Sequence, residues 1–227
     1  IEFFAEEFTE SNHVFIRPGC ERFIADLYKA VEPGTKLLYI AKDNEFSNGF
    51  RLEEYKYVIN LTKIKNGSDY IESVFQGKEK KNIKREIRII GEKNPEIVIN
   101  DFNDLPILFD LNIKNFGKDS NFNLINWRRG TVDLLRLDFD IHLLAIIIDG
   151  KKQAVSLAIF YNNVYYLLAT GSNNKEIPNL GKYLIVKNID YAKNLGASIL
   201  DASIGDCHWK KRWHLDRIPQ YKYYKLR

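Results

Sequence analysis

The chain has 227 residues, and its fractions of hydrophobic (45%) and charged (28%) residues are ordinary for a soluble globular protein. Its formal net charge is only +4, because 34 Lys and Arg nearly balance 30 Asp and Glu, which argues against a general nucleic-acid-binding protein. The longest apolar run, HLLAIII at 142–148, is much shorter than the ~20 residues that span a bilayer.

The cysteine content points to a reducing compartment. Cys20 and Cys207 are far apart in sequence, so they form no metal-type pair, and two cysteines do not make a secreted disulfide scaffold. We therefore expect a cytoplasmic protein without a metal site. A disulfide between the two cysteines is left open.

The first part of the chain alternates between helix and strand patterns. Residues 20–31 have apolar side chains at helical spacing, and Pro33-Gly34 ends this helix. Strands are predicted at 36–42 and 56–64, with a polar loop at 44–49 that is a candidate domain boundary.

A basic helix follows. Residues 68–90 predict a helix with Ser68 as its N-cap and an interruption at Gly77. Its second part carries six cations above an apolar stripe: Lys78, Lys80, Lys81, Lys84, Arg85 and Arg88. These cations form either a solvated face or a surface for phosphate or another anionic substrate, and Lys84 and Arg85 are the substrate-binding candidates.

The remaining elements predict a mixed sheet. A strand at 96–100 and helices at 102–116 and 126–137 precede three apolar strands within 142–172. Asp149-Gly150 and Asn162-Asn163 join these three strands, and both pairs favour the positive φ angles of tight hairpins. The rest of the pattern is a helix at 180–195 ended by Gly196, a strand at 198–203 and a last strand at 221–226.

This order has a consequence for ligand binding. The crossover helix places the strand at 198–203 parallel to its neighbour in an otherwise antiparallel meander. A sheet of this kind splays at the junction and leaves a gap that suits an extended ligand. The segment GDCHWKKRW at 205–213 leaves the sheet there. If it is extended, Lys210 and Arg212 lie opposite Trp209 and Trp213, with the cations free to bind a carboxylate or phosphate.

Taken together, these motifs resemble the Gcn5-related N-acetyltransferase (GNAT) superfamily, and most closely its Fem-like and CelD-like acyltransferase branch. The resemblance is carried by YVINLTK before the basic helix, IIIDGKKQAVSLAIFYNNVYYLLATGSN, NLGKYLIVKNIDYAKNLG and LDASIGDCHWKKRW. It implies an α/β (α+β) fold at 56–227, with a mixed, mostly antiparallel sheet flanked by helices and a cleft where the sheet splays. Residues 1–55 would be an N-terminal α/β segment, the remnant of a first GNAT-like half.

The resemblance also implies a donor site. In this superfamily, backbone N–H groups at the start of one helix bind the donor pyrophosphate, because unpaired donors and the helix dipole favour an anion there. The corresponding residues are Asn179, Leu180, Gly181, Lys182 and Tyr183, of which only Asn179 and Gly181 fit the usual signature. Fem-like relatives use aminoacyl-tRNA, so acyl-CoA, such as acetyl-CoA, and aminoacyl-tRNA are both candidate donors.

The strand end before that helix is the second part of the implied donor site. Ala169, Thr170 and Gly171 either pair with the acyl donor through their backbone groups or form a simple turn.

Transfer to an amine needs a base and an acid. Asp206 and His208 are the candidate bases. Tyr165, Tyr166 and Tyr183 are possible acids, of which Tyr166 is taken as the catalytic candidate, although each also suits sheet or helix packing. Lys210 and Arg212 would hold an anionic part of a small-molecule or peptide acceptor. Two alternatives stay open: a catalytically degenerate binding module, and an RNA-binding protein that uses the basic helix. The oligomeric state is open.

Overall fold

The chain divides into two units, and the boundary passes through two of its strands. A computed structural model describes residues 23–41, 50–206 and 208–225. One unit comprises Ile1–Val58 and Ala202–Arg227, and the other comprises Ile59–Asp201. We call them unit 1 and unit 2. Cys20, the predicted loop at 44–49 and Cys207 lie outside the described residues.

Unit 1 contains a small antiparallel sheet. Its elements are α1 (Ile24–Ala30), β1 (Lys36–Ala41), most of β2 (Phe50–Asn60), the short α7 (Trp209–Arg212) and β8 (Asp216–Tyr224). β8 pairs antiparallel with both β1 and β2. Its core combines Leu37 and Ile40 with aromatic side chains, among which the rings of Tyr28 and Phe50 meet edge to face with their centroids 4.8 Å apart.

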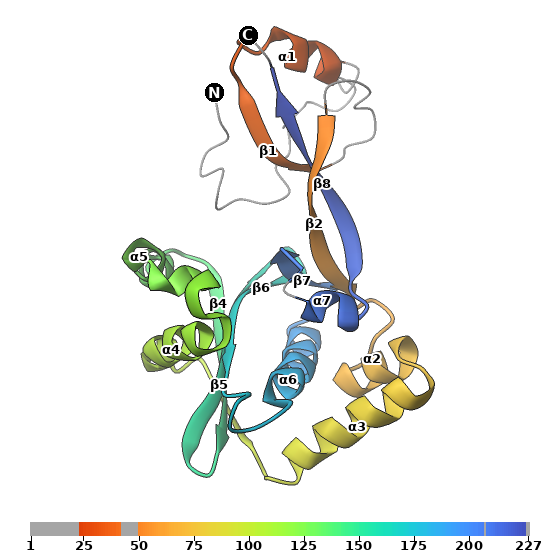
Figure 1. Cartoon of the computed structure of the whole chain (residues 1–227), viewed down its shortest axis with the longest axis vertical. Coiled ribbons are helices and arrows are strands. Elements are labelled where there is room, and N and C mark those ends of the chain that lie inside the picture. Colours follow the sequence, from red (N-terminus) through yellow and green to blue (C-terminus); the bar gives the residue numbers. More distant parts are fainter. Residues whose placement is uncertain (1–22, 42–49, 207, 226–227) are drawn as a thin grey trace. The chain divides into compact units, whose positions relative to one another are not determined.

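Unit 2 contains the predicted meander and its helices (Figure 1). Its elements are α2 (Gly67–Val74), α3 (Gly77–Gly91), β3 (Glu96–Ile99), the 3-10 turn η3 (Phe102–Asp104), α4 (Leu105–Phe116), α5 (Ile125–Leu134), β4 (Asp140–Ile148), β5 (Lys151–Tyr161), β6 (Val164–Ser172), α6 (Leu180–Asn194) and the first part of β7 (Ile199–Ile204). The strand order is β7-β6-β5-β4-β3. Among the described strand pairs of this order, β6–β7 alone is parallel, so the predicted mixed, mostly antiparallel sheet is confirmed.

Helices cover both faces of this sheet. Leu143 and Ala145 of β4 belong to the core that packs against α4, whereas Leu144 and Ile146 belong to the core that packs against α6 and the end of α3. Figure 1 shows α4 and α6 on opposite sides of β4 and β5. Because both faces are covered, β4 is an almost continuous apolar run instead of an alternating one.

The local turn predictions are confirmed. Asp149 and Gly150 adopt φ of 52° and 70°, and Asn162 and Asn163 adopt 49° and 60°. These are the left-handed angles that two-residue hairpins need. Gly196 has φ of 85° directly after α6, as expected for the residue that ends a helix.

Several boundaries differ from the predictions. β2 begins at Phe50, before the predicted start at residue 56, because its polar first half pairs with β8, and it ends at Asn60. β8 begins at Asp216, before the predicted start at residue 221. The predicted N-cap Ser68 lies inside α2, and the cap is Asn66, whose side chain accepts a hydrogen bond from the Asp69 N–H at 2.9 Å. The interruption at Gly77 is confirmed, since it separates α2 from α3.

Candidate functional site

The β6–β7 pairing ends early. The parallel ladder joins Val164 to Ile199, Tyr165 to Leu200 and Tyr166 to Asp201, while β6 continues to Ser172. On its other side β6 has a bulge: Leu157 of β5 pairs with Ala169, and the next β5 residue pairs with Leu167. Leu168 is therefore the extra residue, and the bulge changes which face the following side chains occupy. This irregular part of β6 contains the residues predicted to meet the donor.

Gly171 lies against α4. A Cβ atom added at Gly171 would lie 2.7 Å from Leu111 Cβ, 2.8 Å from Asn112 N and 2.9 Å from Leu108 O. The Asn112 side chain also donates a hydrogen bond to the Thr170 carbonyl at 2.7 Å. The close approach of α4 therefore accounts for the glycine, and one of the backbone groups predicted to pair with a donor already has a partner.

The first N–H groups of α6 are also satisfied within the chain. The Leu180 N–H donates to Ile177 O, the Lys182 and Tyr183 N–H groups both donate to Asn179 O, and the Gly181 N–H donates to Asn174 Oδ1 at 2.8 Å. The N–H groups of Leu180, Gly181 and Lys182 stand at positions that are ordinarily unpaired within a helix and available to an anion, whereas the Tyr183 N–H makes the first regular helical bond. The predicted donor-phosphate residues from Leu180 to Tyr183 thus lie together at the start of α6, with their backbone N–H groups occupied.

The loop before α6 is held by polar contacts with β5 and α4. The Asn173 N–H and side-chain amide donate to the Gln153 carbonyl and side-chain oxygen, respectively. Lys114 Nζ donates to Asn173 Oδ1 at 2.8 Å and to Glu176 Oε1 at 2.9 Å. Hydrogen bonds to the Glu176 carboxyl, first from Lys114 and then from the Asn173 side chain, hold its pKa below the usual value. The loop therefore carries a carboxylate at neutral pH.

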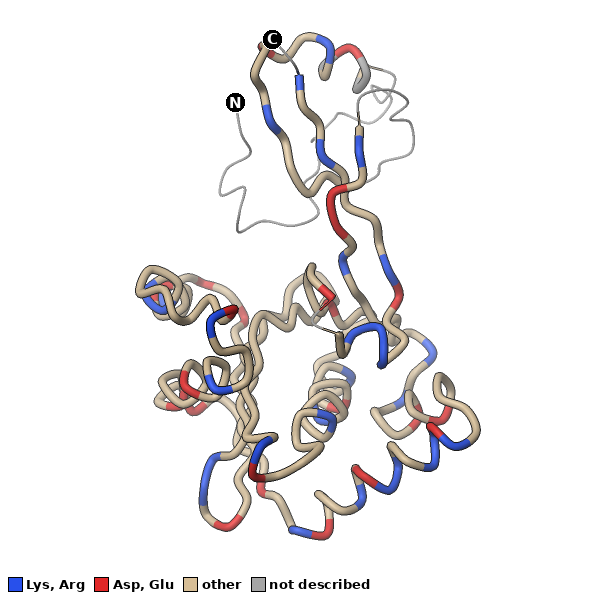
Figure 2. The backbone as a smooth tube through the Cα atoms, viewed as in Figure 1, with Lys and Arg blue, Asp and Glu red and all other residues tan. Residues whose placement is uncertain are grey.

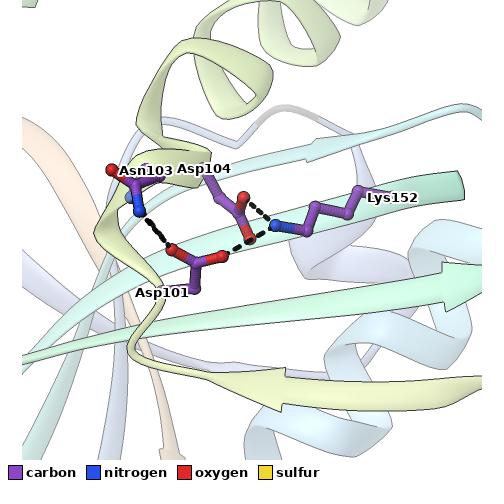
Figure 3. A network of polar contacts seen from close by, with 4 residues as sticks. All are labelled: Asp101, Asn103, Asp104 and Lys152. Atoms are coloured by element: carbon purple, nitrogen blue, oxygen red, sulfur yellow. Dashed lines mark hydrogen bonds and ion pairs between the residues drawn. The ribbon is translucent and has the colours of Figure 1, made fainter.

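Lys152, the second residue after the Asp149-Gly150 turn, also has partners within the chain (Figure 3). Lys152 Nζ contacts Asp101 Oδ2 at 2.9 Å and pairs with Asp104, which is buried at the start of α4. Asp101 in turn accepts hydrogen bonds from Asn103. The two aspartates raise the pKa of Lys152, so its ammonium is stabilised between them. Lys152 thus fixes the start of α4 to β5.

The cations of α3 are partly neutralised. Lys84 and Lys80 both pair with Glu72 of α2, and Figure 2 shows basic and acidic residues interleaved along α3. Lys182 of α6 pairs with Glu86 at 2.6 Å. Arg85 is exposed. Of the two substrate-binding candidates on this helix, Lys84 therefore has a carboxylate partner.

In unit 1, Lys210 is buried. Its side chain is 3% exposed, its ammonium donates to Ser203 O at 3.0 Å and Ile204 O at 2.6 Å, and it lies 5.3 Å from the ring centre of Tyr57. Residues 209–212 form a helical turn, so the predicted alternation of cations and indoles in an extended stretch is wrong. Lys210 has the surroundings of a structural residue, whereas Arg212 is exposed and donates to His208 O.

The two candidate bases differ in their surroundings. Asp206 Oδ2 lies 2.7 Å from Lys211 Nζ, and this hydrogen bond is the main reason why the pKa of the Asp206 carboxyl is lowered. Its Oδ1 is buried and has no hydrogen-bond partner among the described residues. His208 is exposed and has a left-handed backbone, with φ of 57°. Burial and the Asp206 charge raise the pKa of Tyr57, which the sequence analysis did not single out.

Three asparagines at or near the donor-site elements were missed by the sequence analysis. Asn112 and Asn174 bond to the backbone of β6 and α6. Asn188 lies on the buried face of α6, where its side-chain oxygen accepts hydrogen bonds from Ser156 and Tyr165 of the sheet. An asparagine in a helix or loop carries no sequence signal of such a bond. Tyr166, the candidate acid, lies in β6 opposite Ile159 and is partly buried.

The described residues hold no group of three or more His, Cys, Asp or Glu side chains arranged for a metal ion. Within the same ranges, no helix combines the length and apolar character needed to cross a bilayer.

Solved structures share this fold at low sequence identity. FemX superposes with a TM-score of 0.59 and 14% identity, over 78% of this chain and 66% of FemX. A conserved protein of unknown function from Bacteroides thetaiotaomicron superposes with a TM-score of 0.56 and 14% identity, over 89% of this chain and 66% of that one. L-PGS from Bacillus licheniformis superposes with a TM-score of 0.53 and 10% identity, over 79% of this chain and 63% of L-PGS. The chain thus spans about two thirds of the length of these proteins.

No curated protein sequence matches the chain. The profile of the acetyltransferase (GNAT) domain family matches residues 77–211, which is more than half of the chain and includes every element from α3 to the turn of α7. The chain therefore belongs to the acetyltransferase (GNAT) domain family.

Proposed function

We propose that this chain is an N-acyltransferase that moves an acyl or aminoacyl group directly from its donor to an amine acceptor. The observation that supports this proposal is the family match over 77–211, in a chain whose parallel β6–β7 ladder ends after three positions. Residues 56–227 would be the acyltransferase domain and 1–55 an N-terminal segment. The donor would be acyl-CoA, such as acetyl-CoA, or aminoacyl-tRNA, and the acceptor a small molecule or peptide in the cytoplasm.

In the proposed step, the amine nitrogen attacks the acyl carbonyl carbon while the bond from that carbon to the donor sulfur or oxygen breaks. A base takes a proton from the amine nitrogen, and the leaving group takes up a proton. His208 is the better base, because imidazole is suited to proton transfer near neutral pH and His208 is exposed. The lowered pKa of Asp206 makes its carboxylate a weak proton acceptor there. Tyr166 would protonate the leaving group.

Substrate binding is assigned on the same basis. The end of β6 (169–171) and the start of α6 (179–183) would meet the donor, while Arg212 and Arg85 would hold anionic parts of the substrates. A second candidate function, a GNAT-like binding module without catalysis, is favoured by one observation: the first N–H groups of α6 already have partners within the chain.

A transfer assay separates the two functions. The purified chain would be incubated with acetyl-CoA or with aminoacyl-tRNA and a panel of amines, and acylated amine would be detected by mass spectrometry. We expect product that depends on both donor and acceptor, and a loss of about 10²–10⁴-fold in rate for His208→Ala. Donor binding without product from any donor and acceptor pair would favour the binding module. Asp206→Asn is the matched control for His208→Ala, and an equal loss of rate in both would contradict the assignment of the base.

A further inference from the structure

The start of α6 differs from an open anion site because a side chain of the same loop occupies it. Asn174 Oδ1 accepts the Gly181 N–H at 2.8 Å, and Asn174 Nδ2 donates to Ser172 Oγ at 2.8 Å. The amide orientation follows from these two bonds, because only an oxygen can accept from the Gly181 N–H. The Asn174 side chain thus joins the last residue of β6 to the first turn of α6.

We propose that Asn174 determines donor specificity: its amide oxygen takes the place that a donor phosphate would occupy at Gly181, so the chain disfavours a pyrophosphate-bearing donor. This inference rests on the proposed acyl transfer. It assigns to Asn174 a role in choosing the donor, and no role in the chemical step.

The space around Gly181 supports this role. A Cβ atom built at Gly181 would lie 3.0 Å from Asn174 Nδ2 and 3.2 Å from Ser172 Oγ, so the asparagine fills the space directly beside the glycine. A phosphate oxygen that bonds to the Gly181 N–H must displace the asparagine oxygen. The other early N–H groups, of Leu180, Lys182 and Tyr183, are used by the backbone.

The local charges act in the same direction. Glu176 places a carboxylate on the loop, and the Lys114 ammonium that contacts this loop is paired with it at 2.9 Å. Lys182, the cation in the first turn of α6, is paired with Glu86 at 2.6 Å. Lys114 and Lys182 would therefore meet a pyrophosphate at this position with their charge already balanced by carboxylates.

Removing the Asn174 side chain, which caps the Gly181 N–H, should therefore increase the affinity of the chain for a pyrophosphate group. A hydrogen bond to a charged group contributes about 1.5–3 kcal/mol, which corresponds to about a 10- to 150-fold change in Kd. We expect Asn174→Ala to bind coenzyme A at least about tenfold more tightly than the wild type, because the Gly181 N–H becomes available to a phosphate. Pantetheine, which lacks the pyrophosphate, should bind both forms equally.

The matched control is Asn173→Ala. It removes the side-chain contacts to Gln153 and Lys114 and so loosens the same loop, but it leaves the Asn174 cap in place. A second variant, Asn174→Asp, keeps an oxygen acceptor and adds a negative charge, so its affinity for coenzyme A should equal or fall below that of the wild type. All four forms would be titrated with coenzyme A, pantetheine and inorganic pyrophosphate by calorimetry, after circular dichroism has shown that each is folded.

Three results would overturn the inference: equal affinity of the wild type and Asn174→Ala for coenzyme A, an equal gain in Asn173→Ala, or an equal gain for pantetheine. Absence of binding to every form counts as the first of these. If Asn174→Ala does not fold, the inference would be overturned by an Asn174→Asp variant that binds coenzyme A more tightly than the wild type does. The titrations require no acceptor and no turnover. Failure to transfer would thus refute the proposed function alone, and unchanged affinities would refute the role of Asn174 alone.

Discussion

Substitution of Gly171 by alanine tests whether this glycine serves packing or donor binding. The added Cβ would lie 2.7 Å from Leu111 Cβ and 2.8 Å from Asn112 N, whereas ordinary contacts are 3.4–4 Å. α4 would have to move by roughly 0.7 Å, and overpacking of this kind costs about 1–3 kcal/mol. The same movement would weaken the bond from Asn112 to the Thr170 carbonyl, at about 1 kcal/mol. We therefore expect Gly171→Ala to lower the free energy of unfolding by about 2–4 kcal/mol.

Urea unfolding followed by circular dichroism measures this change. With an m-value of about 2 kcal/mol/M, the midpoint should fall by about 1–2 M. The matched control is Gly130→Ala in α5, where the added Cβ meets no described atom within 4 Å and helix propensity should raise stability by about 0.5–1 kcal/mol. A Gly171→Ala protein with wild-type stability would refute the packing argument. If that protein had also lost donor binding, the role predicted from the sequence would be the correct one.

Three further predictions concern buried and paired polar groups. Asn188→Ala should lower the free energy of unfolding in urea by more than about 2 kcal/mol, since two buried hydroxyls lose their acceptor. The double variant with Tyr165→Phe should recover part of that loss, because one of the two unpaired hydroxyls is then absent. The lowered pKa of Asp206 means that its pairing with Lys211 stabilises the fold at pH values above the ordinary carboxyl pKa. This stabilisation is lost as the pH falls through the pKa of the folded state. The free energy of unfolding, measured from pH 7 to pH 3, should therefore fall less steeply for Asp206→Asn than for the wild type. Lys210→Met should lower the free energy of unfolding by about 1.5–3 kcal/mol, because two backbone carbonyls lose a charged donor. A smaller loss than that caused by Lys211→Met, at an exposed lysine, would contradict the structural role of Lys210.

The features that were predicted correctly depend on residues close together in the sequence. The hairpins at 149–150 and 162–163 and the end of α6 at Gly196 each follow from the φ angles that Asn, Asp and Gly adopt readily. The parallel β6–β7 pair follows from the crossover helix between them. None of these features requires knowledge of a distant partner.

The features that were missed depend on such partners. The first half of β2 lacks an apolar pattern, and it is a strand because β8, more than 150 residues later, pairs with it. Asn112 contacts Thr170 across 58 residues of sequence. A hydrogen bond between one side chain and one backbone group recurs at no period, so periodicity cannot reveal it.

The segment at 205–213 shows why residue type alone cannot assign a cation to a ligand. The sequence places Lys210, Lys211 and Arg212 side by side, and only the helical turn of α7 determines that the first is buried while the other two are exposed. The buried ammonium then bonds to Ser203 O and Ile204 O at the end of β7, where Ser203 has φ of 66°. Left-handed backbone at a residue with a side chain is unfavourable and persists only where the surroundings compensate for it. Lys210 supplies such compensation, so the buried cation of the predicted acceptor site acts on the shape of its own loop, and the proposed contact with an anionic part of the acceptor falls to the exposed Arg212.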